Sequence, residues 1–222
     1  MVFSANEQPP EARPIGLISD VHGNLPALTA VLREFDREGV GRILVAGDLI
    51  LGGDAPLETW RALVAAKAQC VRGLSDRALV EVDPDDVETS DPTEKKRLDA
   101  FRATRSALGE LVLEQLRRLP ETLRLPLIDG SELILVHGSP ADSTLEIGHD
   151  LTEEEVRFRI ADDPADIVVC GSTHVPVIWD LGDQRVINVG SVGMAPEGRV
   201  AHYGLLRPRM GGAELRLDHV EY

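Results

Sequence analysis

The chain has 222 residues, which is enough for one domain with a sizeable hydrophobic core, or for one domain that carries a small insertion. Its hydrophobic fraction of 43% and charged fraction of 27% are ordinary for a globular protein, and no apolar run approaches the roughly 18 residues that a membrane span needs. A net charge of −15 argues against nonspecific binding to DNA or RNA, and it also repels small phosphates unless a bound cation reverses the field locally.

The N-terminal end of the sequence predicts a tail rather than a leader. Prolines and polar residues interrupt it early, so it lacks the charged-then-apolar layout of a signal peptide. We therefore expect residues 1–13 to form a disordered tail and residues 14–222 to form a single domain. Cys70 and Cys170 adjoin apolar stretches and have no CxxC partner, which favours buried free thiols in a cytoplasmic protein. A disulfide between them stays open but has no support in the sequence.

The first part of the domain predicts a strand–helix–strand unit. Residues 14–19 and 43–46 are apolar runs, and apolar residues recur at helical spacing between them. Asn24 stands where it can cap the helix. Such a crossover pairs its two strands in parallel and brings Asp20 and Asp48, one at the end of each strand, to the same edge of a sheet. This is the edge at which ligands bind in open α/β sheets.

The middle of the chain predicts helices and one solvated loop. Residues 56–66 have the apolar spacing of a helix. Residues 82–93 are rich in Asp, Pro and Ser without any periodicity, and this acidic run is typical of a solvated loop. Residues 94–119 predict a long amphipathic helix with a break near Gly109. Residues 82–119 thus form a helical insertion, whose simplest role is to cover the core; a cap or a partner surface is the alternative.

From Glu121 onwards the pattern changes to short strands. Residues 123–128 and 133–136 flank an Asp-Gly turn and predict a hairpin. A Thr–Glu capping box predicts a helix over residues 153–160. Five more strands are expected, at residues 167–170, 177–181, 186–189, 202–206 and 214–218.

Side chains that commonly bind metals stand at the ends of four predicted strands. They are Asp20 and His22 after the first strand, Asp48 after the second, His137 after the hairpin, and His174 after the strand that ends at residue 170. This set suits a divalent transition metal such as Mn, Fe, Zn or Ni, because carboxylates supply charge, imidazoles supply borderline-soft nitrogen, and neighbouring glycines allow close backbone approach. One such residue alone is usually a helix cap or a loop residue, but four strands that deliver this chemistry to one edge predict a metal site.

Six blocks of sequence, in order, resemble the motifs of the calcineurin-like metallophosphoesterases. They are residues 19–24 (Ser-Asp-Val-His-Gly-Asn), 46–49 (Ala-Gly-Asp-Leu), 71–76 (Val-Arg-Gly-Leu-Ser-Asp), 136–140 (Val-His-Gly-Ser-Pro), 171–176 (Gly-Ser-Thr-His-Val-Pro) and 188–191 (Asn-Val-Gly-Ser). The nearest shape in this superfamily is the short bacterial phosphodiesterase-like branch. The resemblance implies an α/β fold of four layers, α-β-β-α, in which two mainly mixed β-sheets lie face to face with helices outside.

The resemblance also implies a centre for two metal ions that share the carboxylate of Asp48. The residues that would hold the first ion are all present, and they are Asp20, His22, Asp48 and His174. The second ion would take Asp48, His137, an Asn and a further His. This chain has Leu74 and Ser172 at the last two positions, so the first site is complete and the second lacks two of its four ligands.

Two further positions bear on catalysis. Ser75 occupies the position of the histidine that protonates the leaving group in this superfamily, and Asn24 stands at a position that would contact the substrate. Leu74 has no donor atom for a metal and Ser172 offers only a neutral hydroxyl, so a second ion is expected to bind weakly. One metal still lowers the pKa of its water and polarises a phosphoryl oxygen, whereas the missing general acid costs about 10²–10⁴-fold in rate. Neither serine lies in the G-x-S-x-G turn of a serine hydrolase.

Two functions of different classes follow from this pattern. The first is a metal-dependent phosphoesterase of weakened activity, which hydrolyses a phosphomonoester or a phosphodiester and for which manganese is the first metal to test. The alternative is a catalytically degenerate relative that binds a ligand or serves as a scaffold without turnover. The complete first site favours the phosphoesterase. We expect a small phosphorylated substrate or ligand and no membrane association; a homo-oligomer or a protein partner stays open.

Overall fold

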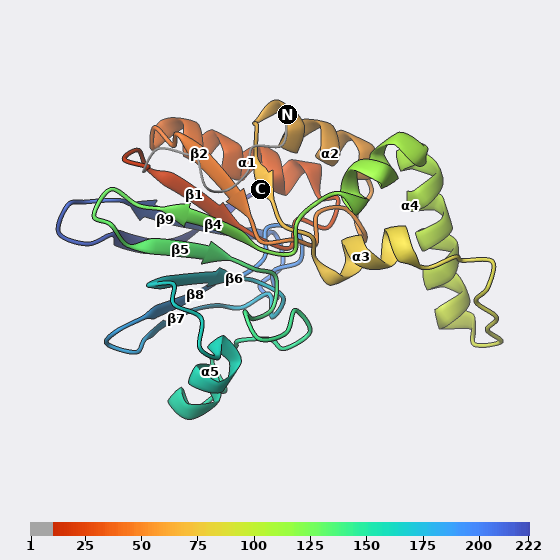
Figure 1. The fold of residues 1–222 in the computed structure, drawn as a ribbon. Coiled ribbons are helices and arrows are strands. Elements are labelled where there is room, and N and C mark those ends of the chain that lie inside the picture. Colours follow the sequence, from red (N-terminus) through yellow and green to blue (C-terminus); the bar gives the residue numbers. More distant parts are fainter. Residues whose placement is uncertain (1–10) are drawn as a thin grey trace.

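The computed structural model describes residues 11–222, whose strands form two five-stranded sheets (Figure 1). The first sheet has the order β10-β9-β1-β2-β3. Its strands are β1 (Ile15–Ile18), β2 (Arg42–Val45), β3 (Gln69–Cys70), β9 (Val200–Arg207) and β10 (Glu214–Glu221). Strands β1 and β2 pair in parallel, and helix α1 (Leu25–Arg37) connects them in the sequence, so the predicted strand–helix–strand unit is confirmed.

The second sheet has the order β4-β5-β6-β8-β7. Its strands are β4 (Leu123–Pro126), β5 (Glu132–Leu135), β6 (Ile167–Cys170), β7 (Pro176–Asp180) and β8 (Arg185–Val189). The antiparallel β4–β5 pair is the predicted hairpin, and β5, β6 and β8 run in parallel. Both sheets therefore mix parallel and antiparallel pairs, as the resemblance implied.

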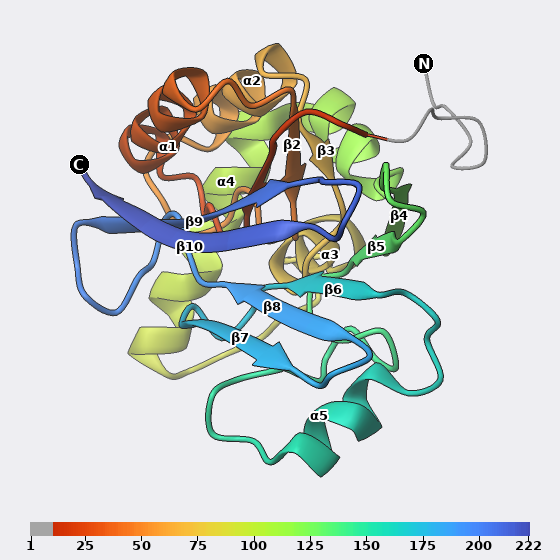
Figure 2. The same cartoon turned by 90° about the vertical axis from the view of Figure 1, so that its left-hand side faces the viewer.

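The two sheets lie face to face and helices cover their outer faces, which gives the four predicted layers (Figure 2). Apolar side chains of both sheets fill the space between them, for example Leu17 and Leu44 from the first sheet and Leu135, Val169 and Ile187 from the second. Helices α1 and α2 (Pro56–Ala65) and the second half of α4 (Pro92–Arg117) pack on the outer face of the first sheet. Helix α5 (Glu153–Ile160) packs on the outer face of the second. The predicted architecture is thus confirmed.

Helix α1 begins where the sequence predicts it. The side chain of Asn24 caps it, because its Oδ1 accepts a hydrogen bond of 3.2 Å from the backbone N–H of Ala27. The helix then buries one apolar face, which includes Leu28, Val31 and Phe35, against the first sheet. This packing fixes the loop between β1 and α1, which carries Asp20 and His22.

Helix α3 (Leu74–Glu81) was not among the predicted elements. Gly73 is its N-cap, and the helix packs against α4. Helix α4 has the predicted break at Gly109, where φ is 68° and ψ is 167°. Arg105 of α4 donates a hydrogen bond of 3.0 Å to the carbonyl oxygen of Val82, just past the end of α3. The segment between the two helices, residues 82–91, is the predicted acidic loop, which is mostly exposed.

The predicted tail covers residues 1–13, of which residues 1–10 lie outside the described part of the chain. Glu11 is buried, pairs with Leu127 in an isolated parallel bridge, and forms an ion pair of 3.0 Å with Arg42. Cys70 and Cys170 are free and buried, as predicted, and burial raises the pKa of both thiols. Between residues 11 and 222, no helix is both long and apolar enough to cross a lipid bilayer.

Candidate metal centre

The ends of four strands, two from each sheet, bring all five predicted metal ligands together. Their side-chain donor atoms form two groups, in each of which the atoms lie within 4.8 Å of one another. The first group is Asp20, His22 and His174, and the second is Asp20, Asp48 and His137. Four of the five side chains are buried, and His174 is partly exposed.

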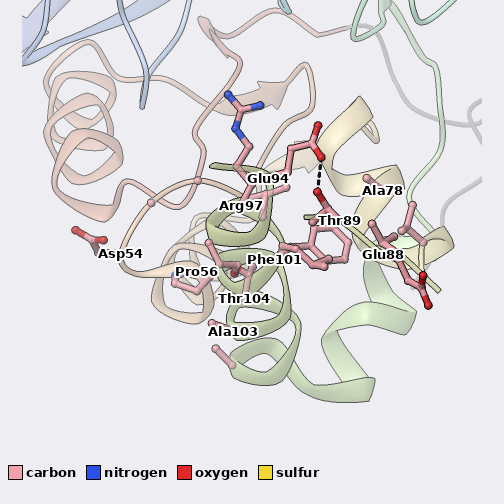
Figure 3. A pocket seen from close by; sticks show the side chains of 18 residues that line it. Asp54, Pro56, Ala78, Glu88, Thr89, Glu94, Arg97, Phe101, Ala103 and Thr104 are labelled. Atoms are coloured by element: carbon pink, nitrogen blue, oxygen red, sulfur yellow. Dashed lines mark hydrogen bonds between the residues drawn. The ribbon is translucent and has the colours of Figure 1, made fainter. Parts of the chain in front are cut away.

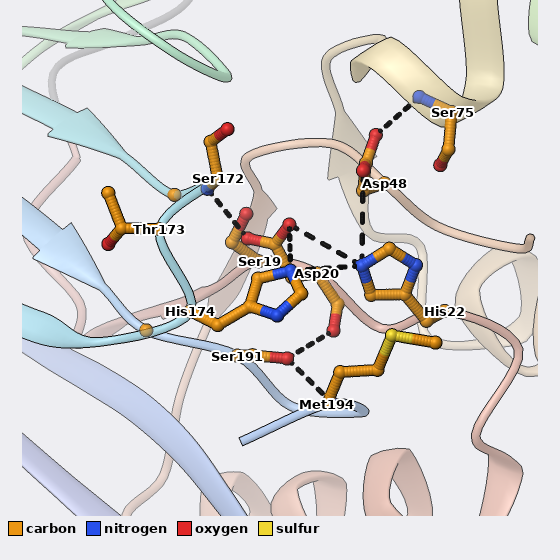
Figure 4. Close-up of polar contacts among 12 residues, drawn as sticks. Ser19, Asp20, His22, Asp48, Ser75, Ser172, Thr173, His174, Ser191 and Met194 are labelled. Atoms are coloured by element: carbon orange, nitrogen blue, oxygen red, sulfur yellow. Dashed lines mark hydrogen bonds and ion pairs between the residues drawn. The ribbon is translucent and has the colours of Figure 1, made fainter. Parts of the chain in front are cut away.

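The first group is compact (Figure 4). Oδ1 of Asp20 lies 3.3 Å from Nε2 of His174 and 3.7 Å from Nε2 of His22. The Nε2 atoms of His22 and His174 lie 3.2 Å from each other, and Oδ2 of Asp48 lies 3.9 Å from Nε2 of His22. Three of the four residues that the resemblance assigns to the first ion thus form one compact group, and the fourth, Asp48, approaches this group at His22.

Asp48 connects the two groups. While its Oδ2 faces His22, its Oδ1 lies 3.5 Å from Nε2 of His137. Its position agrees with the bridging carboxylate that the resemblance implies.

Backbone groups orient the ligands. Nδ1 of His22 lies 2.7 Å from the carbonyl oxygen of Leu51, and Nδ1 of His137 lies 2.7 Å from that of Ala46. A carbonyl can only accept, so each Nδ1 carries the proton and donates it, which leaves Nε2 free as a metal ligand when the ring is neutral. Both rings thus point their lone pairs into the centre.

The carboxylates are held in the same way. Oδ2 of Asp20 accepts a hydrogen bond of 2.9 Å from the N–H of Ser172, and Oδ1 of Asp48 accepts one of 2.8 Å from the N–H of Ser75. Ser191 fixes the backbone beneath Asp20, because its hydroxyl donates to the carbonyl oxygen of that residue over 2.8 Å.

The centre concentrates unusual backbone conformations. Seven non-glycine residues of the described chain have positive φ, and five of them are at the centre: Asp20 (53°), His22 (48°), Asp48 (52°), Ser172 (73°) and His174 (62°). Such conformations are uncommon for residues with a Cβ and persist where the surroundings enforce them, often at functional sites. The contacts within the centre therefore hold the turns after these strands in backbone conformations that would otherwise be unfavourable.

Two glycines allow the close approach that the sequence predicts. A Cβ on Gly73 would lie 2.2 Å from Oδ1 of Asp48, and a Cβ on Gly171 would lie 2.5 Å from Oδ2 of Asp20. Neither distance is compatible with a side chain, so both positions require glycine if the carboxylates keep their places.

The donor set fits a divalent cation. Oδ1 of Asp20 is buried and accepts no hydrogen bond from any residue between 11 and 222, although it faces two imidazoles. Burial acts to raise the pKa of Asp20, but His174 and His22 outweigh it and hold that pKa well below its usual range. Burial acts to lower the pKa of His22, but Asp20 and the charge of Asp48 reverse this and raise it. Concentrated negative charge beside imidazole nitrogens suits a transition-metal ion.

The positions that depart from the superfamily pattern are at this centre too. Ser172 turns its hydroxyl to Glu146, to which it donates a hydrogen bond of 2.9 Å, and only its N–H contacts Asp20. The Oγ of Ser75 is buried and has no hydrogen-bond partner in the described chain. Leu74 is the first residue of α3, directly before Ser75, and is partly buried.

Asn24 has other contacts in the structure. Besides capping α1, its Nδ2 donates to the carbonyl oxygen of Gly193 over 3.0 Å and lies 2.8 Å from the hydroxyl of Tyr222. The assignment of Asn24 to substrate binding therefore stays a prediction.

Sequence reasoning gave no role to Asp76 or Glu146. Asp76 is fully buried and accepts hydrogen bonds of 3.0 Å from the N–H groups of Leu49 and Gly73, which ties α3 to the turn that carries Asp48. Its burial and the nearby charge of Asp48 raise its pKa to about 7. An acid three residues after an N-cap is a recognisable capping pattern, so Asp76 could have been found. Glu146 lies in an irregular loop and had no comparable pattern.

Comparisons with known proteins agree with this geometry. The family model described as the calcineurin-like phosphoesterase superfamily domain matches residues 14–210, and the chain belongs to this superfamily. It is similar to the protein MJ0912 of Methanocaldococcus jannaschii, with 27% identity over 201 residues, 83% of this chain and 78% of the relative.

Two solved structures show the same fold. The protein PH1004 of Pyrococcus horikoshii OT3 matches with a TM-score of 0.77 and 25% identity over 94% of this chain and 88% of its own. A metallophosphoesterase from Sphaerobacter thermophilus matches with a TM-score of 0.72 and 27% identity over 96% of this chain and 89% of its own. Divalent metals are the cofactors of this superfamily, and the donor groups described above are its candidate ligands.

Proposed function

We propose that this protein is a metal-dependent phosphoesterase that hydrolyses a small phosphomonoester or phosphodiester, with one ion bound by Asp20, His22, Asp48 and His174. The observation that carries the proposal is the close grouping of donor atoms from Asp20, His22 and His174, with a buried carboxylate oxygen of Asp20 that accepts no hydrogen bond from residues 11–222. Mn, Fe, Zn and Ni all suit this mixture of carboxylate and imidazole ligands. Cytoplasmic location is part of the proposal and is supported by the two free buried thiols.

The chemistry needs few protein groups beyond these ligands. Hydrolysis adds water across a P–O ester bond, so that a hydroxyl goes to phosphorus and a proton to the released alcohol. A bound divalent ion supplies a Lewis acid for a phosphoryl oxygen and lowers the pKa of a water molecule. The chain orients its donors through the carbonyl groups of Leu51 and Ala46. Ser75 cannot protonate a leaving group as a histidine would, so esters with good leaving groups should react best.

A second candidate is a binding or scaffold protein without turnover. It is favoured by Leu74, Ser75 and Ser172, since all three replace residues that serve the second ion or the leaving group. His137 and Asp48 would then be the only protein ligands of a second ion from the superfamily's set, and such an ion would bind weakly.

The two candidates differ in turnover. The experiment measures bound metal per chain and the hydrolysis of p-nitrophenyl phosphate and of bis(p-nitrophenyl) phosphate with added manganese. We expect about one tightly bound ion and slow hydrolysis, which Asp48→Asn abolishes. Asp162→Asn removes an exposed carboxylate just beyond α5 and should leave both unchanged.

Two results would overturn parts of the proposal. Two tightly bound ions in the wild-type protein would contradict the weak second site. If the wild-type protein shows no turnover, whereas Leu74→Asn, Ser75→His and Ser172→His together restore it, the protein is the non-catalytic relative.

A further inference from the structure

A cavity of about 940 Å³ lies between the N-terminal half of α4, helix α3 and the loop that follows β2 (Figure 3). Its wall is mainly apolar and includes Pro56, Val82, Leu98 and Phe101. Cavities of roughly 300–1,000 Å³ with such walls are typical of small-molecule sites. Residues of the helical insertion therefore form part of a cavity wall and do not only cover the core.

The cavity and the candidate metal centre share one loop. Leu51 lines it and also supplies the carbonyl oxygen that holds Nδ1 of His22 at 2.7 Å. Gly52 is part of the wall as well, and a Cβ placed on it would lie 3.6 Å from Nδ1 of His22. The loop that orients this metal ligand is thus one side of the cavity.

Helix α3 connects the two sites along one face. Residues four positions apart share a helix face, so Leu74, Ala78 and Val82 follow one another along α3 and its C-cap. Ala78 and Val82 line the cavity, and the next residue after Leu74 donates its N–H to Asp48. Leu74 stands at the end of α3 that is nearer to Asp48, and Ala78 and Val82 at the end that lines the cavity.

The charged side chains around the cavity limit the kind of ligand that it can bind. Asp54, Glu88 and Glu94 line it against a single guanidinium, that of Arg97. This excess of negative charge repels a second anionic group, so a nucleoside polyphosphate is a poor fit. An uncharged apolar group fits both the wall and the charge.

We propose that the cavity binds the apolar ester group of the substrate while the phosphate lies at the metal centre. The apolar group is the ester group that stays on phosphorus, so the substrate class is a phosphodiester that carries an uncharged alkyl chain of medium length beside its leaving group. This inference rests on the proposed function, and its test must separate the two.

The first experiment varies the ester group and keeps the leaving group constant. Manganese-loaded protein is assayed with methyl, butyl and hexyl p-nitrophenyl phosphate. Burial of methylene groups should raise kcat/KM by at least about tenfold from methyl to hexyl. Ala103→Trp, which places a bulky side chain in the wall of the cavity, should remove most of this gain, whereas Leu111→Trp, at a 75% exposed position on the same helix outside the cavity, should keep it. Equal rates for all three esters would overturn the inference and leave the phosphoesterase in place.

The second experiment needs no turnover. Calorimetry compares methylphosphonate with hexylphosphonate on manganese-loaded protein. Hexylphosphonate should bind at least about tenfold more tightly, and Ala103→Trp should abolish the difference. If this preference is found without any hydrolysis, the cavity is confirmed as a ligand site and only the proposed activity fails. Equal affinities, or hexylphosphonate binding that is unchanged after metal removal, would overturn the inference.

Discussion

At the scale of single residues, the contacts of Ser172 are consistent with the proposal that the first metal site is complete and the second is weakened. Its backbone N–H holds Oδ2 of Asp20, a contact that any residue except proline can make. Its side chain faces Glu146, where an imidazole would be needed as a ligand. Under the proposed assignment, serine at this position removes a ligand of the second ion and leaves the support of Asp20 intact.

The second ion should be recoverable by restoring its missing ligands. Leu74→Asn combined with Ser172→His adds an amide oxygen and an imidazole, so the affinity for a second manganese ion should rise by at least about tenfold. Calorimetric titration with Mn²⁺ measures it. Ser172→Ala is the control and should change neither ion; an unchanged single-ion titration of the double variant would contradict the assignment of these positions.

Gly171 is predicted to be irreplaceable for steric reasons. A Cβ there would lie 2.0 Å from Oγ of Ser19 and 2.5 Å from a carboxylate oxygen of Asp20, so Gly171→Ala should destabilise the protein by about 1–3 kcal/mol and weaken metal binding. Urea unfolding and manganese titration measure the two effects. Gly211→Ala is the matched control, since a Cβ on Gly211 meets nothing within 4 Å, and its stability should change by less than about 0.5 kcal/mol. Equal behaviour of the two variants would show that the turn at Gly171 shifts freely.

At the scale of elements, local pattern was enough for the strand–helix–strand unit, the hairpin and α5, because their apolar spacing and caps lie in the sequence itself. The same patterns placed five ligands at strand ends. Helix α3 was not predicted. Asp76 is a local capping signal for it, but its start also depends on distant contacts, from Asp76 to Leu49 and from Ser75 to Asp48. The cavity could not be predicted either, since the distance between α4 and the loop after β2 is a tertiary property.

The break in α4 yields a prediction with a clear sign. In a regular helix, replacing an exposed glycine by alanine stabilises by up to about 1 kcal/mol. Gly109 has φ of 68° and ψ of 167°, a region that is essentially restricted to glycine, so Gly109→Ala should instead destabilise by about 1–3 kcal/mol. Thermal unfolding distinguishes stabilisation from destabilisation. A Cβ on Gly109 meets nothing within 4 Å, so only the backbone conformation opposes alanine. A rise in Tm would therefore mean that α4 can continue as a regular helix through residue 109.

At the scale of the whole molecule, the metal centre lies where the two sheets meet. The first sheet supplies Asp20, His22 and Asp48 from the ends of β1 and β2, and the second supplies His137 and His174 from the ends of β5 and β6. A bound ion would therefore cross-link the two sheets, and it would offset the negative charge of carboxylates packed close together in an acidic protein of net charge −15.

This cross-link predicts that metal binding stabilises the entire fold. At a free manganese concentration of 100 times Kd, binding adds about 2.7 kcal/mol to the free energy of unfolding, which for a chain of this size corresponds to a rise in Tm of about 5–10 °C. Differential scanning calorimetry with manganese and then with EDTA measures the rise and its reversal. His174→Ala removes a ligand of the second sheet and should abolish most of the shift, whereas His149→Ala removes an exposed histidine outside both ligand groups and should keep it. A shift that survives His174→Ala would contradict the assignment of His174 as a ligand of this ion.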